Sequence, residues 1–295
     1  MHYLTDPWHL GFSRHALIAG FLAGALCGLV GVYVVLRRMS YIGHGLSHAI
    51  FGGAVASYAV NVNFYLGAGA WGFLSALLIN GVSRRRQIGA DAAIGVVTTA
   101  SFAVGVALIS HPHKFTLNPD AALFGNILGV TTNGLFVLLG VTIFVAAVVF
   151  FRYRQLLFIT FDPEVADAYG VNSKRYDTLF ALVMAATIVS TLQLLGVTLI
   201  AAIIVVPAIV ARLVTDSFGK LVLTSAAVGA SCSVVGVYLS YYNDIPSGAT
   251  IVLVTAALFS VVFVVTALTA RRRLSRLGAD HGSADIGGGP SVHVG

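Results

Sequence analysis

Long apolar stretches follow one another along most of the chain, and only short polar intervals separate them. A helix needs about 20 mostly apolar residues to cross the hydrocarbon of a bilayer, so this pattern predicts membrane-spanning helices. We expect an all-α integral membrane protein, because a bilayer leaves backbone polar groups unpaired outside helices and closed barrels. The stretches cover residues 16–36, 41–60, 65–82, 92–109, 134–151, 178–214, 221–241 and 248–268.

The stretch at 178–214 is too long for one crossing and barely long enough for two. Gly196 and Pro207 interrupt it, and such breaks are tolerated at membrane depth where neighbouring groups satisfy the freed backbone. We therefore predict a polytopic bundle of about eight to nine transmembrane helices, including short or broken helices around 178–214. The predicted parts are an extracytoplasmic segment at 1–15, a transmembrane domain at 16–270 and a disordered, Gly-rich cytoplasmic tail at 271–295.

The composition agrees with a single membrane domain. Hydrophobic residues make up 58% of the chain and charged residues 9%, and the mean hydropathy is +0.91. A soluble core of this size would need more polar covering. The two cysteines, Cys27 and Cys232, fall inside predicted spans and offer no disulfide framework.

Lysine and arginine gather in the intervals between spans and predict the orientation. Basic residues favour cytoplasmic loops, and an even number of crossings separates every pair of consecutive clusters. The predicted N-terminus is outside and the C-terminus inside, although Arg14, just before the first span, argues against this. The same residues account for the net charge of +6, so we expect no nucleic-acid partner. The clusters are Arg37–Arg38, Arg84–Arg86, Arg152 with Arg154, Lys174–Arg175, Arg212 with Lys220, and Arg271–Arg273 with Arg276.

His44 and His48 stand four positions apart in the second predicted span. That spacing puts both rings on one face of a helix, with Cβ atoms about 5–6 Å apart. Imidazole is a good ligand for zinc and other borderline first-row cations, and polar residues inside a membrane are functional candidates. The alternative, that each ring only hydrogen-bonds a neighbouring helix, is about equally supported.

Two imidazoles do not complete a tetrahedral metal site, and no acidic residue lies deep within a predicted span. A second copy of the chain across a twofold axis would supply two more histidines, so we predict a homodimer. Gly20, Gly24 and Gly28 let helices approach closely on the first span. We interpret this ladder as packing within one subunit in preference to a dimer contact.

The chain shows no energy source of its own. It has no phosphate-binding loop of the G-x-x-x-x-G-K-[ST] type, and carriers coupled to ion gradients usually place an acid in the membrane. The polar interval at 156–177 contains a short predicted helix at 162–170 that could dock on a partner protein or rest on the bilayer. Its helix signals and contact residues are Asp162 as cap, Pro163 at the first position, Glu164, Ala166, Tyr169 and, as the stop, Gly170.

Two loops are predicted to face outside, and residues in them could receive a metal ion. His111 and His113 form a His-Pro-His sequence, which is more often simply solvated. Asp120 and Asp244 could lend carboxylates at an entrance. Asp91 is interpreted as the cap of the fourth span, since a side-chain oxygen there satisfies free amides.

Six phrases in order resemble the permease subunit of the bacterial ABC importers for zinc and manganese, from about residue 16 to 268. They are "GVYVVLRRMSYIGHGLSHA", "DAAIGVV", "LFGNILGV", "FDPEVADAYGV", "GVTLIAAIIVVPAIVARL" and "NDIPSGATIVL". The resemblance implies a multi-pass protein of the bacterial plasma (inner) membrane. It also implies two permease copies, a cytoplasmic ATPase dimer and an extracytoplasmic metal-binding protein. It makes 162–170 the ATPase-coupling helix and His48 a metal ligand, with no permanently bound cofactor.

One position departs from that family. Relatives commonly have Asp four residues before the histidine, whereas this sequence has His44. Four imidazoles favour zinc as the transported ion, with manganese next. His44 is six residues beyond Arg38, or about 9 Å along a helix, so the pair is expected in the cytoplasmic half unless the arginines snorkel.

Three other functions remain open from the sequence. The chain could be a gradient-driven metal carrier, or a membrane scaffold or receptor whose histidines only pack. It could also be an ABC permease for a metal chelate such as a siderophore or cobalamin, a class that is usually longer.

Overall fold

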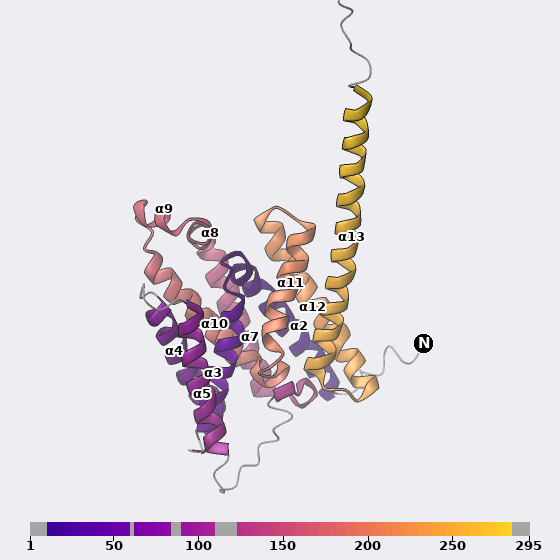
Figure 1. Cartoon of the computed structure of the whole chain (residues 1–295). Helices are drawn as coiled ribbons and strands as arrows, with labels where there is room; N and C mark the ends of the chain where they lie inside the picture. Colours follow the sequence, from indigo (N-terminus) through magenta and orange to yellow (C-terminus); the bar gives the residue numbers. More distant parts are fainter. Residues whose placement is uncertain (1–10, 60–61, 84–89, 110–122, 285–295) are drawn as a thin grey trace, which may run out of the picture.

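The protein is a helical bundle in which the described residues form helices and their connections, without a strand (Figure 1). The computed structural model describes residues 11–59, 62–83, 90–109 and 123–284. The predicted polytopic all-α bundle is confirmed. The helices are α2 (Gly11–Leu36), α3 (Ser40–Ala59), α4 (Phe64–Ser83), α5 (Ala90–Ile109), η2 (Ile127–Gly129), α7 (Thr132–Phe151), α8 (Tyr153–Phe161), α9 (Pro163–Ala168), α10 (Ser173–Leu195), α11 (Ile200–Val214), α12 (Phe218–Asn243) and α13 (Ser247–Ala284).

Within the described ranges, 7 helices are long and apolar enough to cross a bilayer: α2, α4, α5, α7, α10, α12 and α13. Helix α3 has 20 residues, enough for a crossing, but its glycines, serines and histidines make it less apolar than these seven. Helix α11 is shorter, at 15 residues. With α3 and α11 added to these seven, the number of helices is nine, the upper limit of the predicted eight to nine transmembrane helices.

The long apolar stretch at 178–214 divides at Gly196, as predicted. Helix α10 ends at Leu195, and Gly196 adopts a left-handed conformation with φ of 80°. A Cβ atom at Gly196 would also collide with the Leu123 carbonyl oxygen. Pro207, by contrast, lies inside α11 and does not end it.

The unwound backbone at this break is paired with the loop before η2. The Asn126 amide donates to the Gln193 carbonyl at 3.1 Å, and the Thr198 hydroxyl donates to the Leu123 carbonyl at 2.8 Å. The Ile127 amide donates to the Ser247 hydroxyl at 3.1 Å. Three of the six phrases that carry the family resemblance therefore meet at one place and satisfy one another's polar groups, as irregular backbone in a membrane requires.

The glycine ladder of α2 packs against α12 of the same chain. A Cβ atom at Gly24 would collide with the Gly229 carbonyl, and one at Gly28 with the Ser225 carbonyl. The Ser225 hydroxyl donates to the Gly28 carbonyl at 2.6 Å. The interpretation of the ladder as packing within one subunit is therefore confirmed.

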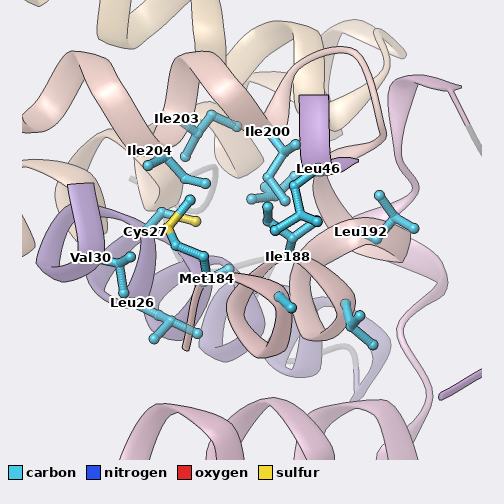
Figure 2. Close-up of a cluster of buried hydrophobic side chains, with 14 of the residues drawn as sticks. Leu26, Cys27, Val30, Leu46, Met184, Ile188, Leu192, Ile200, Ile203 and Ile204 are labelled. Atoms are coloured by element: carbon cyan, nitrogen blue, oxygen red, sulfur yellow. The ribbon is translucent and has the colours of Figure 1, made fainter. Parts of the chain in front are cut away.

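One buried cluster joins α2, α3, α10 and α11 (Figure 2). Its side chains interdigitate from all four helices and hold α3 by the face that carries Leu46 and Ile50, both fully buried. The opposite face of α3 is left for other contacts. The labelled members of the cluster are Leu26, Cys27, Val30, Leu46, Met184, Ile188, Leu192, Ile200, Ile203 and Ile204.

The two ends of the bundle differ. Helices α8 and α9 and the α11–α12 connection lie at one end, whereas the α12–α13 turn lies at the other (Figure 1). Arg37 at the end of α2 contacts Thr160 of α8 and Asp177 of α10. Basic residues that the sequence assigned to the cytoplasm therefore gather at the α9 end. That this end faces the cytoplasm remains a prediction.

Helices α2 and α13 extend past the predicted limits of the membrane domain, which themselves remain a prediction. Helix α2 begins at Gly11, before the predicted start at residue 16. Helix α13 continues to Ala284 and extends past the bundle on the α9 side, so residues 271–284 are helical and do not form the predicted disordered tail (Figure 1). Arginine and leucine favour helix in this segment, and a helix already formed extends at little cost.

A candidate metal-transit site on helix α3

His44 and His48 lie side by side on one face of α3. Their ring centroids are 4.5 Å apart, with the ring planes at 72°. His44 is exposed and His48 is half-buried. The predicted pairing of the two rings on one helix face is thus present, within the first half of α3 and toward the end where Arg37 meets α8.

The rotation of α3 is fixed by contacts on either side of this pair. The Ser47 hydroxyl donates to the Val197 carbonyl at 3.0 Å, which ties α3 to the break between α10 and α11. The His48 ring packs edge-on against Phe102 of α5, with centroids 5.2 Å apart. Leu46 is fully buried on the far side. The open face therefore cannot turn inward without breaking the core.

Helix α5 approaches α3 closely because α3 carries glycines at the contact. A Cβ atom at Gly45 would collide with Ile94, and one at Gly52 with the Ser101 carbonyl. This close approach brings α5 alongside the histidine face. It also brings Asp91, in the first turn of α5, to a cavity that His44 lines.

One chain does not hold a complete metal site in the part that the structure describes. No three His, Cys, Asp or Glu side chains come together there in a way that could hold a metal ion. The chain offers two adjacent imidazoles on an open face, and a metal ion held by them would need further ligands from outside this face. That is the arrangement expected of a half-site.

Of the other predicted entrance residues, the structure describes Asp244, which does not lie at the histidine pair. His111, His113 and Asp120 lie outside the described residues. Asp244 sits in the turn between α12 and α13, at the end of the bundle away from α9, with a left-handed backbone (φ of 53°). It lines a separate cavity of about 290 Å³ together with Asn126, Ser240 and Ser247.

Helix α9 has the start and stop that the sequence predicted. The Asp162 carboxylate accepts from the Val165 amide at 3.0 Å, Pro163 occupies the first turn, and Gly170 follows the helix with φ of 80°. Glu164 also lies in the first turn. Ala166 is fully buried against the bundle, whereas the Tyr169 side chain is 78% exposed.

The segment around α9 is tied to the start of α10. The Ser173 hydroxyl donates to the Pro163 carbonyl at 3.0 Å, and the Ser173 amide donates to the Asp167 carboxylate at 2.8 Å. A short helix held in this way presents a fixed surface with an exposed aromatic side chain. Such a surface is suited to docking another protein.

Sequence reasoning missed an ion pair that joins these elements. Arg37 donates from Nη1 to the Asp177 carboxylate at 2.9 Å and from Nε to the Thr160 hydroxyl at 3.3 Å. Its guanidinium also lies 4.7 Å from the Phe180 ring centroid. Burial lowers the pKa of the Arg37 guanidinium, and the charge of Asp177 opposes that shift. The sequence feature that could have indicated this pair is Asp177, an acidic residue immediately before a long apolar stretch in a chain with few acidic residues.

The chain also resembles known transport proteins along most of its length. Residues 9–266 match the ABC 3 transport family. The manganese transport system membrane protein MntC of Halalkalibacterium halodurans is 35% identical over 252 residues, covering 85% of this chain and 86% of that protein. The manganese import system permease protein ScaB of Streptococcus gordonii is 34% identical over 254 residues, covering 86% and 91%.

Solved structures share the fold. PsaBC from Streptococcus pneumoniae, determined in complex with Fab, is 30% identical, with a TM-score of 0.81 over 89% of this chain and 94% of that chain. A metal-chelate type ABC transporter in an inward-facing conformation has a TM-score of 0.68 at 16% identity over 85% of both chains, which shows a shared fold alone. With the family match and these relatives, the chain belongs to the ABC 3 transport family and is a membrane permease of that family.

Proposed function

We propose that this protein is the membrane-spanning subunit of an ATP-driven importer of divalent transition-metal ions. The observation that carries the proposal is the pair of adjacent imidazoles of His44 and His48 on an open face of α3. Membership of the ABC 3 transport family and relatives named for manganese transport support it. The protein itself is a transport subunit and not an enzyme.

A second copy of the chain would complete the metal site. An open histidine face inside a membrane is unfavourable against lipid, because polar groups there need partners. Two such faces across a twofold axis would place four imidazoles around one ion, the number that a tetrahedral site needs. The ion is cargo, so we expect it to rest there only briefly.

Energy would come from a separate ATPase that docks on α9. The sequence has no phosphate-binding loop of its own. Helix α9 is short, is anchored through Ser173, and exposes Tyr169. We infer that its end of the bundle faces the cytoplasm of a bacterium, with the N-terminus outside. An extracytoplasmic metal-binding protein would then dock at the opposite end, near Asp244. His111, His113 and Asp120 remain candidates from the sequence for the same entrance.

Manganese and zinc are the two candidate ions. The relatives are named for manganese, whereas four imidazoles without a carboxylate favour zinc, because manganese prefers oxygen ligands. We propose manganese as the main cargo, with zinc as the alternative. This ranking reverses the one drawn from the histidines alone.

The test is metal uptake into vesicles that contain the permease and its partner ATPase. We expect ATP-dependent uptake of radioactive manganese, and a comparison with zinc under the same conditions gives the selectivity. His44→Ala and His48→Ala should each abolish uptake while the assembled complex keeps its elution volume. His15→Ala, a partly exposed histidine of α2, serves as the matched control and should transport normally.

Three results would overturn the proposal. Uptake by the permease alone, driven by a proton gradient without ATP, would show a gradient-driven carrier. Undiminished uptake in both histidine variants would show that the rings only pack. Uptake of a metal chelate without uptake of the free ion would indicate a chelate permease.

A further inference from the structure

We infer that Asp91 forms the next resting place of the ion after the histidine pair, in a cavity between α3 and α5 that leads toward the α9 end. This inference rests on the proposed function and deepens it. It names the group that accepts the ion from the imidazoles.

The cavity has a volume of about 400 Å³ and is shared by two helices. Helix α3 contributes Tyr41, His44 and Gly45. Helix α5 contributes the first-turn acid Asp91 and a row of residues one and two turns further on. Among the described residues, α5 also contributes Ile94, Gly95, Thr98 and Thr99 to the lining. His44 therefore faces the histidine site and this cavity at once.

The register of the two helices places Asp91 beyond His44 on the α9 side. Gly45 lies against Ile94 and Thr98, and Gly52 lies against Ser101. Both contacts advance in the same direction, so α3 and α5 run parallel. Counting back along α5 at about 1.5 Å per residue puts Asp91 level with the first turn of α3. An ion moving toward the α9 end would pass His48, then His44, then Asp91.

The chemistry of the cavity suits a hydrated divalent cation. Asp91 is exposed and is the one acidic side chain among the described residues of the lining. Thr98 has a buried hydroxyl that finds no hydrogen-bond partner within the described part of the chain. A buried hydroxyl without a partner is unfavourable unless a ligand or water occupies the space beside it. A metal ion with its bound waters would supply that partner once the Thr98 hydroxyl, which is closed to solvent here, turns toward the cavity.

Asp91 would also supply the oxygen ligand that the histidine pair lacks. The imidazole pair offers nitrogen ligands without negative charge and binds soft or borderline ions, whereas a carboxylate with water is suited to manganese. Transfer from His44 to Asp91 exchanges a nitrogen ligand for an oxygen ligand and involves no covalent or redox change. The negative charge on the exit side would draw the ion out of the histidine site.

Asp91→Asn tests this role, because it keeps the size of the side chain and removes its charge. In vesicles with the partner ATPase, we expect manganese uptake to fall by at least about tenfold, the loss typical when a group supporting a bound metal is removed. Zinc uptake should fall less. Equilibrium metal binding at the histidine pair should be retained, and Asp91→Glu should restore most of the manganese uptake.

The controls separate this inference from a structural role and from the proposed function. Asp216→Asn removes an exposed acid from the α11–α12 connection, outside the cavity lining, and should transport normally. Unchanged manganese uptake in Asp91→Asn, with uptake abolished in His48→Ala, would overturn the role of Asp91 and leave the proposed function standing. Unchanged uptake in both variants would overturn both. Loss of thermal stability without a change of manganese-to-zinc preference would assign Asp91 a structural role only.

Discussion

Replacing Asp177 with alanine should destabilise the bundle by leaving the Arg37 charge without its carboxylate. The Arg37 side chain is 8% exposed and that of Asp177 is 35% exposed. Breaking a fully buried ion pair costs about 3–5 kcal/mol, whereas a hydrogen bond to a charged group contributes about 1.5–3 kcal/mol. Water reaches the Asp177 side, so we expect the lower range, about 1.5–3 kcal/mol.

The remaining contacts of Arg37 limit the loss. The guanidinium keeps its bond to Thr160 and its position over the Phe180 ring, and a cation–π contact contributes about 0.5–2 kcal/mol. The variant should therefore fold. The loss of stability should be greatest at the α9 end of the bundle, where α2, α8 and α10 meet.

The assay is reversible unfolding of the purified permease in mixed micelles, followed by loss of helical circular dichroism as denaturing detergent increases. A double-mutant cycle with Asp177→Ala and Arg37→Ala isolates the pair. We expect a coupling energy of about 1–2 kcal/mol. Arg38→Gln, at the exposed neighbouring arginine, should change stability by less than about 0.5 kcal/mol.

A coupling energy below about 0.5 kcal/mol would refute this reasoning, because it would place the pair among ordinary surface ion pairs. An equal loss in Arg38→Gln would also refute it. In that case the effect would follow from net charge at this end of the bundle and not from the specific contact.

Three further sets of substitutions test the packing, the break and the coupling helix, each by thermal unfolding in detergent. Gly24→Ala should destabilise the protein by about 1–3 kcal/mol, because the new Cβ meets the backbone of α12. The control Gly140→Ala, at a position with open space around it, should stabilise the protein by up to about 1 kcal/mol. Equal effects of the two substitutions would contradict the close contact between α2 and α12. Gly170→Ala should lower stability by about 1–2 kcal/mol, from its positive φ alone. Gly196→Ala should lower stability more, because its new Cβ also meets backbone atoms. The reverse order of the two losses would contradict the described break between α10 and α11. Asp162→Ala should lower stability by about 1 kcal/mol, because it removes the cap of α9. It should also weaken binding of the partner ATPase. Unchanged binding would argue against docking at α9.

The sequence was sufficient to predict the spans and the short helix α9, because both depend on local signals. Apolar length determines a membrane helix, and α9 needs only the cap Asp162, Pro163 at its start and Gly170 at its end. The break at Gly196 followed from the excess length of one stretch. The pairing of His44 and His48 followed from helical periodicity alone.

Contacts between distant segments could not be predicted in the same way. Arg37 was interpreted as a marker of the cytoplasmic side. Its bond to Asp177, far along the chain, could not be predicted from that interpretation. Asp91 was interpreted as a helix cap because its sequence neighbours say nothing of His44 on another helix. The continuation of α13 past residue 270 was missed because loss of hydropathy marks the end of a span and not the end of a helix.

The central claim is that two chains together hold one ion between their histidine pairs. The most direct measurement is the number of manganese or zinc ions bound per chain in the purified complex with its ATPase, for the wild type and for His48→Ala. The account predicts one ion for every two chains, and none at this site in the variant. One ion bound by each chain, or binding that survives in His48→Ala, would contradict it.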